Sequence, residues 1–393
     1  MQSNKIVTPC PAIFVLLCAY LLLPGAAGFA QSLPVIKASS KVVTIKDGVH
    51  NKKGYWYIMP DKKPDVYYVE LPEKDHEVCF ITDKDSISFR VQYGRQYDFI
   101  ILLNDKDSCY TRINALYRNQ VHYKRLCAPC IGASDTIPFA IDSDDKIRFN
   151  ASVNGSRPLY YQLDLGCMGN IINKGSVNKV AMNFDDVDIL TNSDGTNRVP
   201  ASRYNTLQIG HLQWDSLRFT EANNLRRQDG LVGNSLFLGK IVEINYDRQV
   251  LVIHDQLPAT ATTYTRHEIF LDYGIIPFIR AAVIVKDSTY PAWFMFDTGH
   301  FGYCSLTDGF MKKTGLSEFK KGRQGKRVTV EVPQVAINGI TFDNVTAFVR
   351  PPDPNSGYHQ QLGIQLLKYF NVILDNREGF IYLQPNGLLR NRK

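Results

Sequence analysis

Leu159-Tyr-Tyr-Gln-Leu-Asp-Leu-Gly166 and Trp293-Phe-Met-Phe-Asp-Thr-Gly299 are two short apolar runs that both end in Asp-x-Gly. Each is typical of a buried strand that stops at a tight turn, because the apolar run is continuous and a glycine ends it. The two aspartates, Asp164 and Asp297, are 297 − 164 = 133 residues apart. A pattern that occurs twice at this distance indicates two copies of one structural unit.

Other segments repeat in the same order around these runs. Each run follows a predicted hairpin and precedes a later strand pair, an apolar-glycine segment and a closing strand. The further matching pairs are Ile137-Pro-Phe139 with Ile276-Pro-Phe278, Leu207–Trp214 with Val335–Phe342, and Gly233–Leu236 with Gly363–Leu366. We therefore predict duplicated lobes over residues 135–258 and 262–388.

Strand periodicity extends over the whole chain. Runs of β-branched and aromatic residues are separated by Gly, Asn and Asp at intervals of about eight to twelve residues. Residues 31–130 contain six or seven such runs in their first 95 residues or so, which predicts a small β-sandwich-like domain. The predicted fold class is mostly β, with an N-terminal β-sandwich-like domain followed by two duplicated lobes.

The repeated unit resembles one lobe of the aspartic peptidases. Its apolar strand into Asp-Thr-Gly, its later strand pair, and its apolar-glycine segment before a helical turn all match that family. Over residues 135–388 the chain is most similar to the retropepsin-like proteins, with a pepsin-type β fold, that are encoded in tandem in secreted bacterial chains. The resemblance implies an exported aspartic endopeptidase that cleaves a peptide or protein substrate without a cofactor.

Asp164 and Asp297 are the catalytic pair that the resemblance implies. Two carboxyls about 3 Å apart share one proton, because both cannot ionise at that distance. The ionised member takes a proton from the attacking water, and the protonated member donates to the substrate carbonyl. A monomer that pairs its own lobes is favoured, and a dimer that pairs Asp297 with its counterpart is the alternative. The remaining residues of the two active-site turns are Leu165, Gly166, Thr298 and Gly299.

Leu165 departs from the family pattern. Thr298 supplies the hydroxyl that, in family members, bonds across to the other turn, whereas Leu165 has none. Loss of one partner of a reciprocal bond leaves a buried group unsatisfied and loosens the spacing of the two carboxyls. The alternative function is therefore a catalytically degenerate binding protein with the peptidase fold.

Two turn-rich segments correspond to the substrate flaps of the family. Five positive charges in the second segment would bias a cleft toward acidic partners if they faced inward, and would otherwise belong to a solvated loop. Tyr204 is a candidate flap tyrosine that the sequence alone does not assign. The segments are Thr191–Arg198, with Asp194 and Gly195, and Lys320–Arg327, with Gly322 and Gly325.

The composition excludes several other classes of function. With 393 residues, 44% of them hydrophobic, the chain is long enough for two or three folded domains. A net charge of +7 spread along the chain does not indicate nucleic-acid binding. The histidines show no metal-ligand spacing, and Asp185, Asp186 and Asp188 resemble a calcium cluster only loosely. His300, directly after the second turn, is either a group that tunes the pair or an ordinary, partly exposed histidine.

Residues 1–30 read as a signal peptide. Lys5 precedes the apolar run Ala12–Leu23, and Gly28-Phe-Ala30 forms a small-residue cleavage site. No segment is long and apolar enough for a stable membrane span. We expect an exported protein, periplasmic or extracellular. Cys127-Ala-Pro-Cys130 has the spacing of a redox or metal motif, but also fits a local disulfide or a turn between domains.

Overall fold

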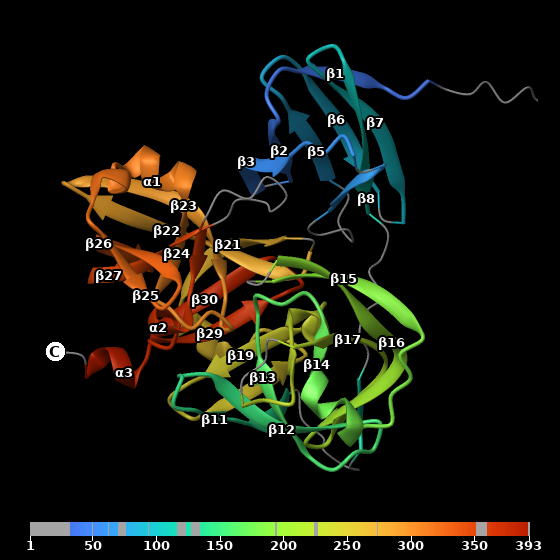
Figure 1. Cartoon of the computed structure of the whole chain (residues 1–393), viewed down its shortest axis with the longest axis vertical. Helices are drawn as coiled ribbons and strands as arrows, with labels where there is room; N and C mark the ends of the chain where they lie inside the picture. The colour runs from blue at the N-terminus through green and yellow to red at the C-terminus, as the bar shows by residue number, and fades with distance from the viewer. Residues whose placement is uncertain are drawn as a thin grey trace, which may run out of the picture.

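The chain forms three β-rich bodies, an N-terminal domain and two lobes, seen as blue, green and orange ribbons in Figure 1. This arrangement confirms the predicted mostly-β fold class. Among the described residues, no helix is long and apolar enough to cross a bilayer. The computed structural model describes residues 32–48, 50–61, 63–69, 76–92, 94–115, 123–126, 134–192, 195–223, 227–272, 274–350 and 360–391.

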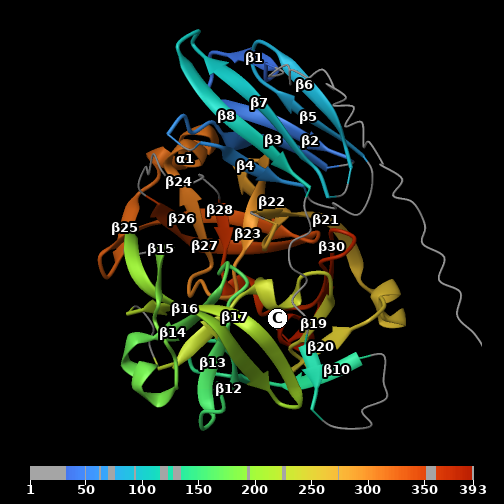
Figure 2. The ribbon, with the colours of Figure 1, turned by 90° about the vertical axis from the view of Figure 1, so that its right-hand side faces the viewer.

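The N-terminal domain is built from two four-stranded sheets. Their orders are β1-β7-β8-β4 and β3-β2-β5-β6. Buried side chains from both sheets, such as Val43, Phe80 and Phe99, form a core of their own. Figure 2 shows the strands of this domain gathered at the top of the view. The strands are β1 (Val35–Ala38), β2 (Val42–Asp47), β3 (His50–Tyr57), β4 (Asp65–Tyr68), β5 (His76–Ile81), β6 (Ser86–Val91), β7 (Gln96–Leu103) and β8 (Asp107–Asn114).

The first lobe has one sheet of order β11-β12-β13-β18-β14-β17-β16-β15, and β9 (Tyr123–Arg125) pairs with β17. Two short 3₁₀ helices, η1 (Lys174–Lys179) and η2 (Asn234–Phe237), follow strands β14 and β18. The lobe strands are β11 (Ala140–Ile141), β12 (Ile147–Val153), β13 (Leu159–Leu163), β14 (Asn170–Asn173), β15 (Asp186–Asn192), β16 (Gly195–Ile209), β17 (Leu212–Ala222) and β18 (Gly230–Val232).

The second lobe uses the same arrangement of neighbours, β22-β23-β28-β24-β27-β26-β25. In both lobes the strand before Asp-x-Gly pairs in parallel with the later short strand, β13 with β18 and β23 with β28. The strands are β22 (Ile276–Val285), β23 (Ser288–Phe296), β24 (Cys304–Thr307), β25 (Lys321–Gln324), β26 (Arg327–Ile337), β27 (Ile340–Arg350) and β28 (Gln360–Leu362). The helices are α1 (Asp308–Thr314), η4 (Leu316–Glu318) and α2 (Ile364–Leu367).

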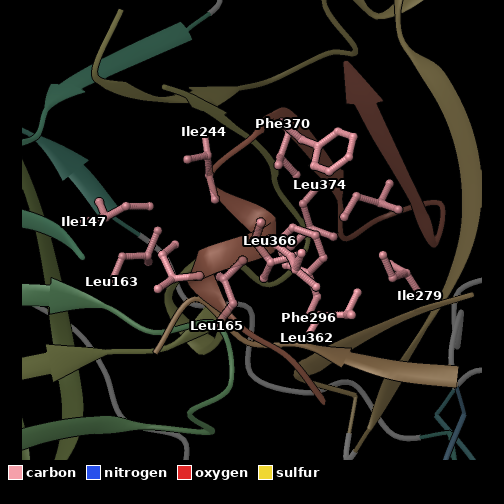
Figure 3. Close-up of a cluster of buried hydrophobic side chains, with 14 of the residues drawn as sticks. Ile147, Leu163, Leu165, Ile244, Ile279, Phe296, Leu362, Leu366, Phe370 and Leu374 are labelled. Atoms are coloured by element: carbon pink, nitrogen blue, oxygen red, sulfur yellow. The ribbon is translucent and has the colours of Figure 1, made fainter. Parts of the chain in front are cut away.

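A run of six strands, β10-β20-β19-β29-β30-β21, joins the lobes, with the β19–β29 pairing at its centre. One hydrophobic core continues from lobe to lobe beside it, and Figure 3 shows Leu165 among residues from both lobes. The strands are β10 (Ser134–Pro138), β19 (Ile241–Asn245), β20 (Val250–His254), β21 (Thr265–Asp272), β29 (Phe370–Asp375) and β30 (Phe380–Pro385). The helices outside the sheets are η3 (Ala259–Thr263) and α3 (Gly387–Arg390).

One proposed sequence match is wrong. Ile137-Pro-Phe139 spans the end of β10, where Ile137 pairs with Leu251, whereas Ile276-Pro-Phe278 begins β22 and pairs with β21. The two triplets therefore occupy different positions in the fold. Both prolines lie near a strand end, where the loss of a backbone donor is tolerated, so the likeness reflects a shared local requirement.

Candidate active site

Each Asp-x-Gly aspartate directly follows a central strand of its lobe. The Asp164 amide donates to the Val232 carbonyl at 2.9 Å, and the Asp297 amide donates to the Leu362 carbonyl at 3.1 Å. These acceptors are the last residues of β18 and β28. The same backbone bond therefore fixes the start of both turns.

The two turns place their carboxyl groups against each other. A Cβ atom added to Gly166 would overlap the carboxyl of Asp297, and one added to Gly299 would overlap that of Asp164. Glycine is required at both positions because each carboxyl lies over the glycine of the opposite turn. The two carboxyl groups also lie close enough to act on each other electrostatically. The structure thus brings the two predicted aspartates together.

Asp297 receives more hydrogen bonds than Asp164. Its Oδ1 accepts from the amides of Gly299 at 2.7 Å and His300 at 2.9 Å, and its Oδ2 accepts from Gln361 Nε2. Asp164 accepts from the Gly166 amide at 3.0 Å. Burial and the neighbouring charge of Asp297 raise the pKa of Asp164 to about 8. The raised pKa therefore keeps Asp164 protonated near neutral pH.

Thr298 joins the two turns with its hydroxyl. Its Oγ1 accepts from the Leu165 amide at 3.0 Å and donates to the Leu163 carbonyl at 3.2 Å. Leu165 is only 1% exposed, and its side chain lies in the core shared by the lobes (Figure 3). The hydroxyl interlock between the turns is therefore one-sided, since position 165 contributes a backbone amide but no hydroxyl.

Sequence reasoning missed two side chains at this site, Lys146 and Gln361. Lys146 is 5% exposed, and its Nζ donates to the carbonyl of Gly299 at 2.6 Å and that of Thr298 at 3.3 Å. Burial lowers the pKa of Lys146. Neither residue belongs to a recognisable motif. Each comes from a segment that is distant in sequence from the turn and reaches it only in the folded chain.

His300 is buried rather than partly exposed. It is 8% exposed, and its Nε2 lies 3.2 Å from Ser305 Oγ. Burial lowers its pKa to about 4, so the ring is neutral over most of the pH range. Its amide binds Asp297 and its carbonyl accepts from Ile364, which ties the second turn to α2.

The second predicted flap segment forms the hairpin β25–β26. Gly325 lies in its turn with φ of 60°, whereas Gly322 is a strand residue that pairs with Thr329. Strand β25 is exposed along its length. Arg327 instead lies over two rings beside the second turn, with its guanidinium 4.6 Å from the Phe301 centroid and 5.3 Å from that of Phe348.

The first flap segment falls on the hairpin β15–β16, where Asn192 pairs with Gly195. Asp194 lies outside the described residues, as do Cys127, Cys130 and the whole of residues 1–30. Tyr204 is 78% exposed at a β-bulge of β16, so nothing places its ring at the paired carboxyls. The three aspartates that loosely resemble a calcium cluster form ion pairs with arginines. Arg218 binds Asp186 and Asp188, and Arg203 binds Asp185.

No family model matches the sequence, and no curated protein matches it. Among solved structures, the chain is similar to the crystal structure of an aspartic proteinase from Irpex lacteus. The two are 13% identical with a TM-score of 0.46, over 66% of this chain and 99% of that chain. At this level the likeness is a coarse one and concerns the fold alone.

Proposed function

We propose that the protein is an aspartic endopeptidase, in which Asp164 and Asp297 activate a water molecule to hydrolyse a peptide bond. The observation that carries the proposal is the contact between the two carboxyls, one from each lobe, each lying over the glycine of the opposite turn. Paired carboxyls that share one proton supply a base and an acid together, with no metal in the reaction.

The hydrogen bonds around the pair support a separate role for each aspartate. Asp297, with three donors, is the ionised base that takes a proton from water. Asp164, with its raised pKa, holds the proton and donates it to the oxygen of the scissile carbonyl. Because the pair is coupled, activity depends on the singly ionised pair rather than on either group alone.

Cleavage of a mixed peptide library, followed by mass spectrometry from about pH 3 to about pH 8, tests this proposal. Asp297→Asn and Asp164→Asn should each abolish cleavage while circular dichroism shows an intact fold. Asp343→Asn is the matched control, because Asp343 is an exposed carboxylate of β27 that accepts a hydrogen bond from Gln334. Cleavage that survives either substitution in the pair refutes the proposal.

A second candidate function is peptide binding without hydrolysis. Two observations favour it, the missing hydroxyl at Leu165 and the Gln361 amide that occupies one oxygen of Asp297. A group bound to that oxygen competes with an attacking water. This candidate would be supported over the first if the protein binds peptides that are recovered intact, and if the peptide affinity is unchanged in Asp297→Asn and Asp164→Asn.

Export remains part of the proposal on the strength of the leader-like segment 1–30. Mass spectrometry of the N-terminus of the mature protein tests it. A chain that begins at Gln31 is expected, and an intact Met1 would contradict export by cleavage.

A further inference from the structure

A tight turn of the first lobe, residues 142–146, reaches across to the second lobe. Asp142 holds the turn, because its Oδ1 accepts from the amides of Asp144 and Lys146 at 2.8 and 2.9 Å. Its Oδ2 binds Arg148 at 2.7 Å, which fixes the turn to β12. The turn is therefore held by bonds within the first lobe, in addition to its contacts with the other lobe.

Two consecutive side chains of this turn contact the second lobe. Asp145 Oδ2 accepts from Gln365 at 2.7 Å and from Lys368 at 2.8 Å, at the end of α2. Lys146 donates to the carbonyls of Thr298 and Gly299 within the active-site turn itself. Asp145 thus contacts a helix, and Lys146 contacts the backbone next to Asp297.

Lys146 is a buried cation without a conventional partner. Within the described residues no carboxylate oxygen lies within salt-bridge distance of its Nζ, which binds the backbone carbonyls of Thr298 and Gly299 instead. A buried ammonium group is costly unless a nearby negative charge compensates it. The singly ionised pair of Asp164 and Asp297 supplies that charge, since both carboxyls act electrostatically on Lys146.

We propose that Lys146 is a positioning residue that replaces the hydroxyl missing at Leu165, by holding the second active-site turn from the first lobe and by placing its positive charge beside the aspartate pair. The interlock then has two halves, Thr298 reaching toward the first turn and Lys146 reaching toward the second. The inference rests on the aspartate pair of the proposed function, but it does not require that the pair hydrolyse peptides.

The positive charge of Lys146 determines the direction of the expected effect. A cation beside the pair favours loss of protons from it, so removal of the cation moves each ionisation of the pair to higher pH. The ionisable groups around the site are Asp164, Asp297, Asp142, Arg148, His300 and Cys167. All of these remain in Lys146→Met and Lys146→Gln, so in these two variants the change in charge is confined to position 146.

The test uses the full chain and three substitutions, each also combined with Asp164→Asn. Lys146→Met removes the charge and the donors, whereas Lys146→Gln removes the charge and keeps an amide donor in case the methionine variant does not fold. Lys368→Met is the matched control, because it also removes a lysine that binds across the lobes, but Lys368 contacts Asp145 rather than the active-site turn.

The first measurement is the pH profile of peptide cleavage for each variant. The second, independent measurement is the pH dependence of urea unfolding for each variant with and without Asp164→Asn. Both limbs of the profile, and the pH range over which Asp164 affects stability, should move up by at least about one unit in the two Lys146 variants. Lys368→Met should leave both unmoved. A purely structural role for Lys146 would lower activity or stability without this movement.

The two proposals fail in different ways. Unmoved profiles in Lys146→Met and Lys146→Gln overturn the role of Lys146 and leave the peptidase proposal intact. Absence of cleavage by the unsubstituted protein overturns the peptidase proposal, while the unfolding measurements still decide the role of Lys146.

Discussion

At the scale of single residues, the site depends on groups that bond across the lobe boundary. Thr298 Oγ1 and Lys146 Nζ each bind backbone atoms of the opposite lobe's turn. Both groups are buried, so an unmade bond at either place would leave a polar group without a partner in a medium of low dielectric constant. The spacing of the two carboxyls follows from these contacts and from the glycines that face them.

Thr298→Val should lower the free energy of unfolding by about 1 to 3 kcal/mol, because the buried Leu165 amide loses its acceptor. The shape of the side chain at position 298 is nearly unchanged. Urea unfolding at one pH measures this change. Thr298→Ser keeps the hydroxyl and should lose clearly less stability than the valine variant. Equal losses in the two variants would show that the cross-turn bond contributes nothing to stability.

The raised pKa of Asp164 predicts how stability changes with pH. In the unfolded chain this carboxyl loses its proton near the usual value of 3.8, whereas in the folded chain it keeps the proton up to about 8. Between these values the folded state binds more protons, so stability falls as the pH rises, by up to about 1.4 kcal/mol per pH unit.

Asp164→Asn removes this titration. The stability of the unsubstituted protein minus that of Asp164→Asn should therefore decrease steadily from about pH 5 to about pH 8. Urea unfolding of both proteins at several pH values gives this difference in stability. His300, whose pKa is lowered, changes stability with pH in the opposite direction, but its contribution cancels because both proteins contain it. A difference that does not change with pH would show that Asp164 ionises normally in the folded protein.

The sequence predicted the residues of the turns but not all of the residues around them. Asp164, Thr298 and Gly299 lie within repeated motifs, so local pattern was sufficient to find them. Lys146 and Gln361 act through contacts made only after the lobes fold together, and no local pattern distinguishes them from other surface-type residues. His300 was identified as unusual, but its burial depends on rings and strands that are distant in sequence.

At the scale of elements, Arg327 connects the hairpin β25–β26 to the second active-site turn. Its guanidinium lies over Phe301, two residues after Gly299, and over Phe348 of β27. Such cation–π contacts contribute about 0.5 to 2 kcal/mol each. The hairpin, otherwise exposed along β25, is therefore held at its turn end, where Arg327 pairs with Gln324, against residues that follow the second active-site turn.

Arg327→Ala should release the hairpin. Hydrogen–deuterium exchange of the β25–β26 amides should become faster, while exchange in the central strands β19 and β29 stays unchanged, because local opening needs only the local contacts. Arg323→Ala is the matched control, since Arg323 lies on the exposed strand β25. Equal exchange in Arg327→Ala and the unsubstituted protein would show that the ring contacts do not hold the hairpin.

The sequence predicted most elements but misassigned one relation between them. Hairpins and closing strands follow from alternation and turn residues, which are local signals. The match of Ile137-Pro-Phe139 to Ile276-Pro-Phe278 was wrong because three apolar or proline residues do not specify a strand's partner. Strand partners depend on pairing across the lobes, as in the contact of β19 with β29, which local patterns do not encode.

At the scale of the whole molecule, the hydrophobic core does not follow the boundary between the lobes. One buried cluster includes Leu163 of the first lobe and Leu366 of the second, whereas Phe80 belongs to a separate cluster in the N-terminal domain. Elements that share a core tend to unfold together. The chain should therefore contain two cooperative units rather than three.

Differential scanning calorimetry should resolve two transitions. Phe80→Ala should lower the temperature of one transition, and Leu366→Ala that of the other, because each substitution removes about 2 to 5 kcal/mol from its own core. Three transitions, or a shift of both transitions in either variant, would contradict the division into two units. The repeat alone suggested two separate lobes, since a shared core is a property of their packing.

The central claim is that the two lobes bring Asp164 and Asp297 into one pair that shares a single proton. A neutron crystal structure of the unsubstituted protein at about pH 6 tests it most directly, because deuterons are visible and the pair should then be singly ionised. We predict that the carboxyls are in hydrogen-bonding contact, with one deuteron between them on Asp164. Carboxyls that are separated by another side chain, or that carry no deuteron between them, would contradict the account.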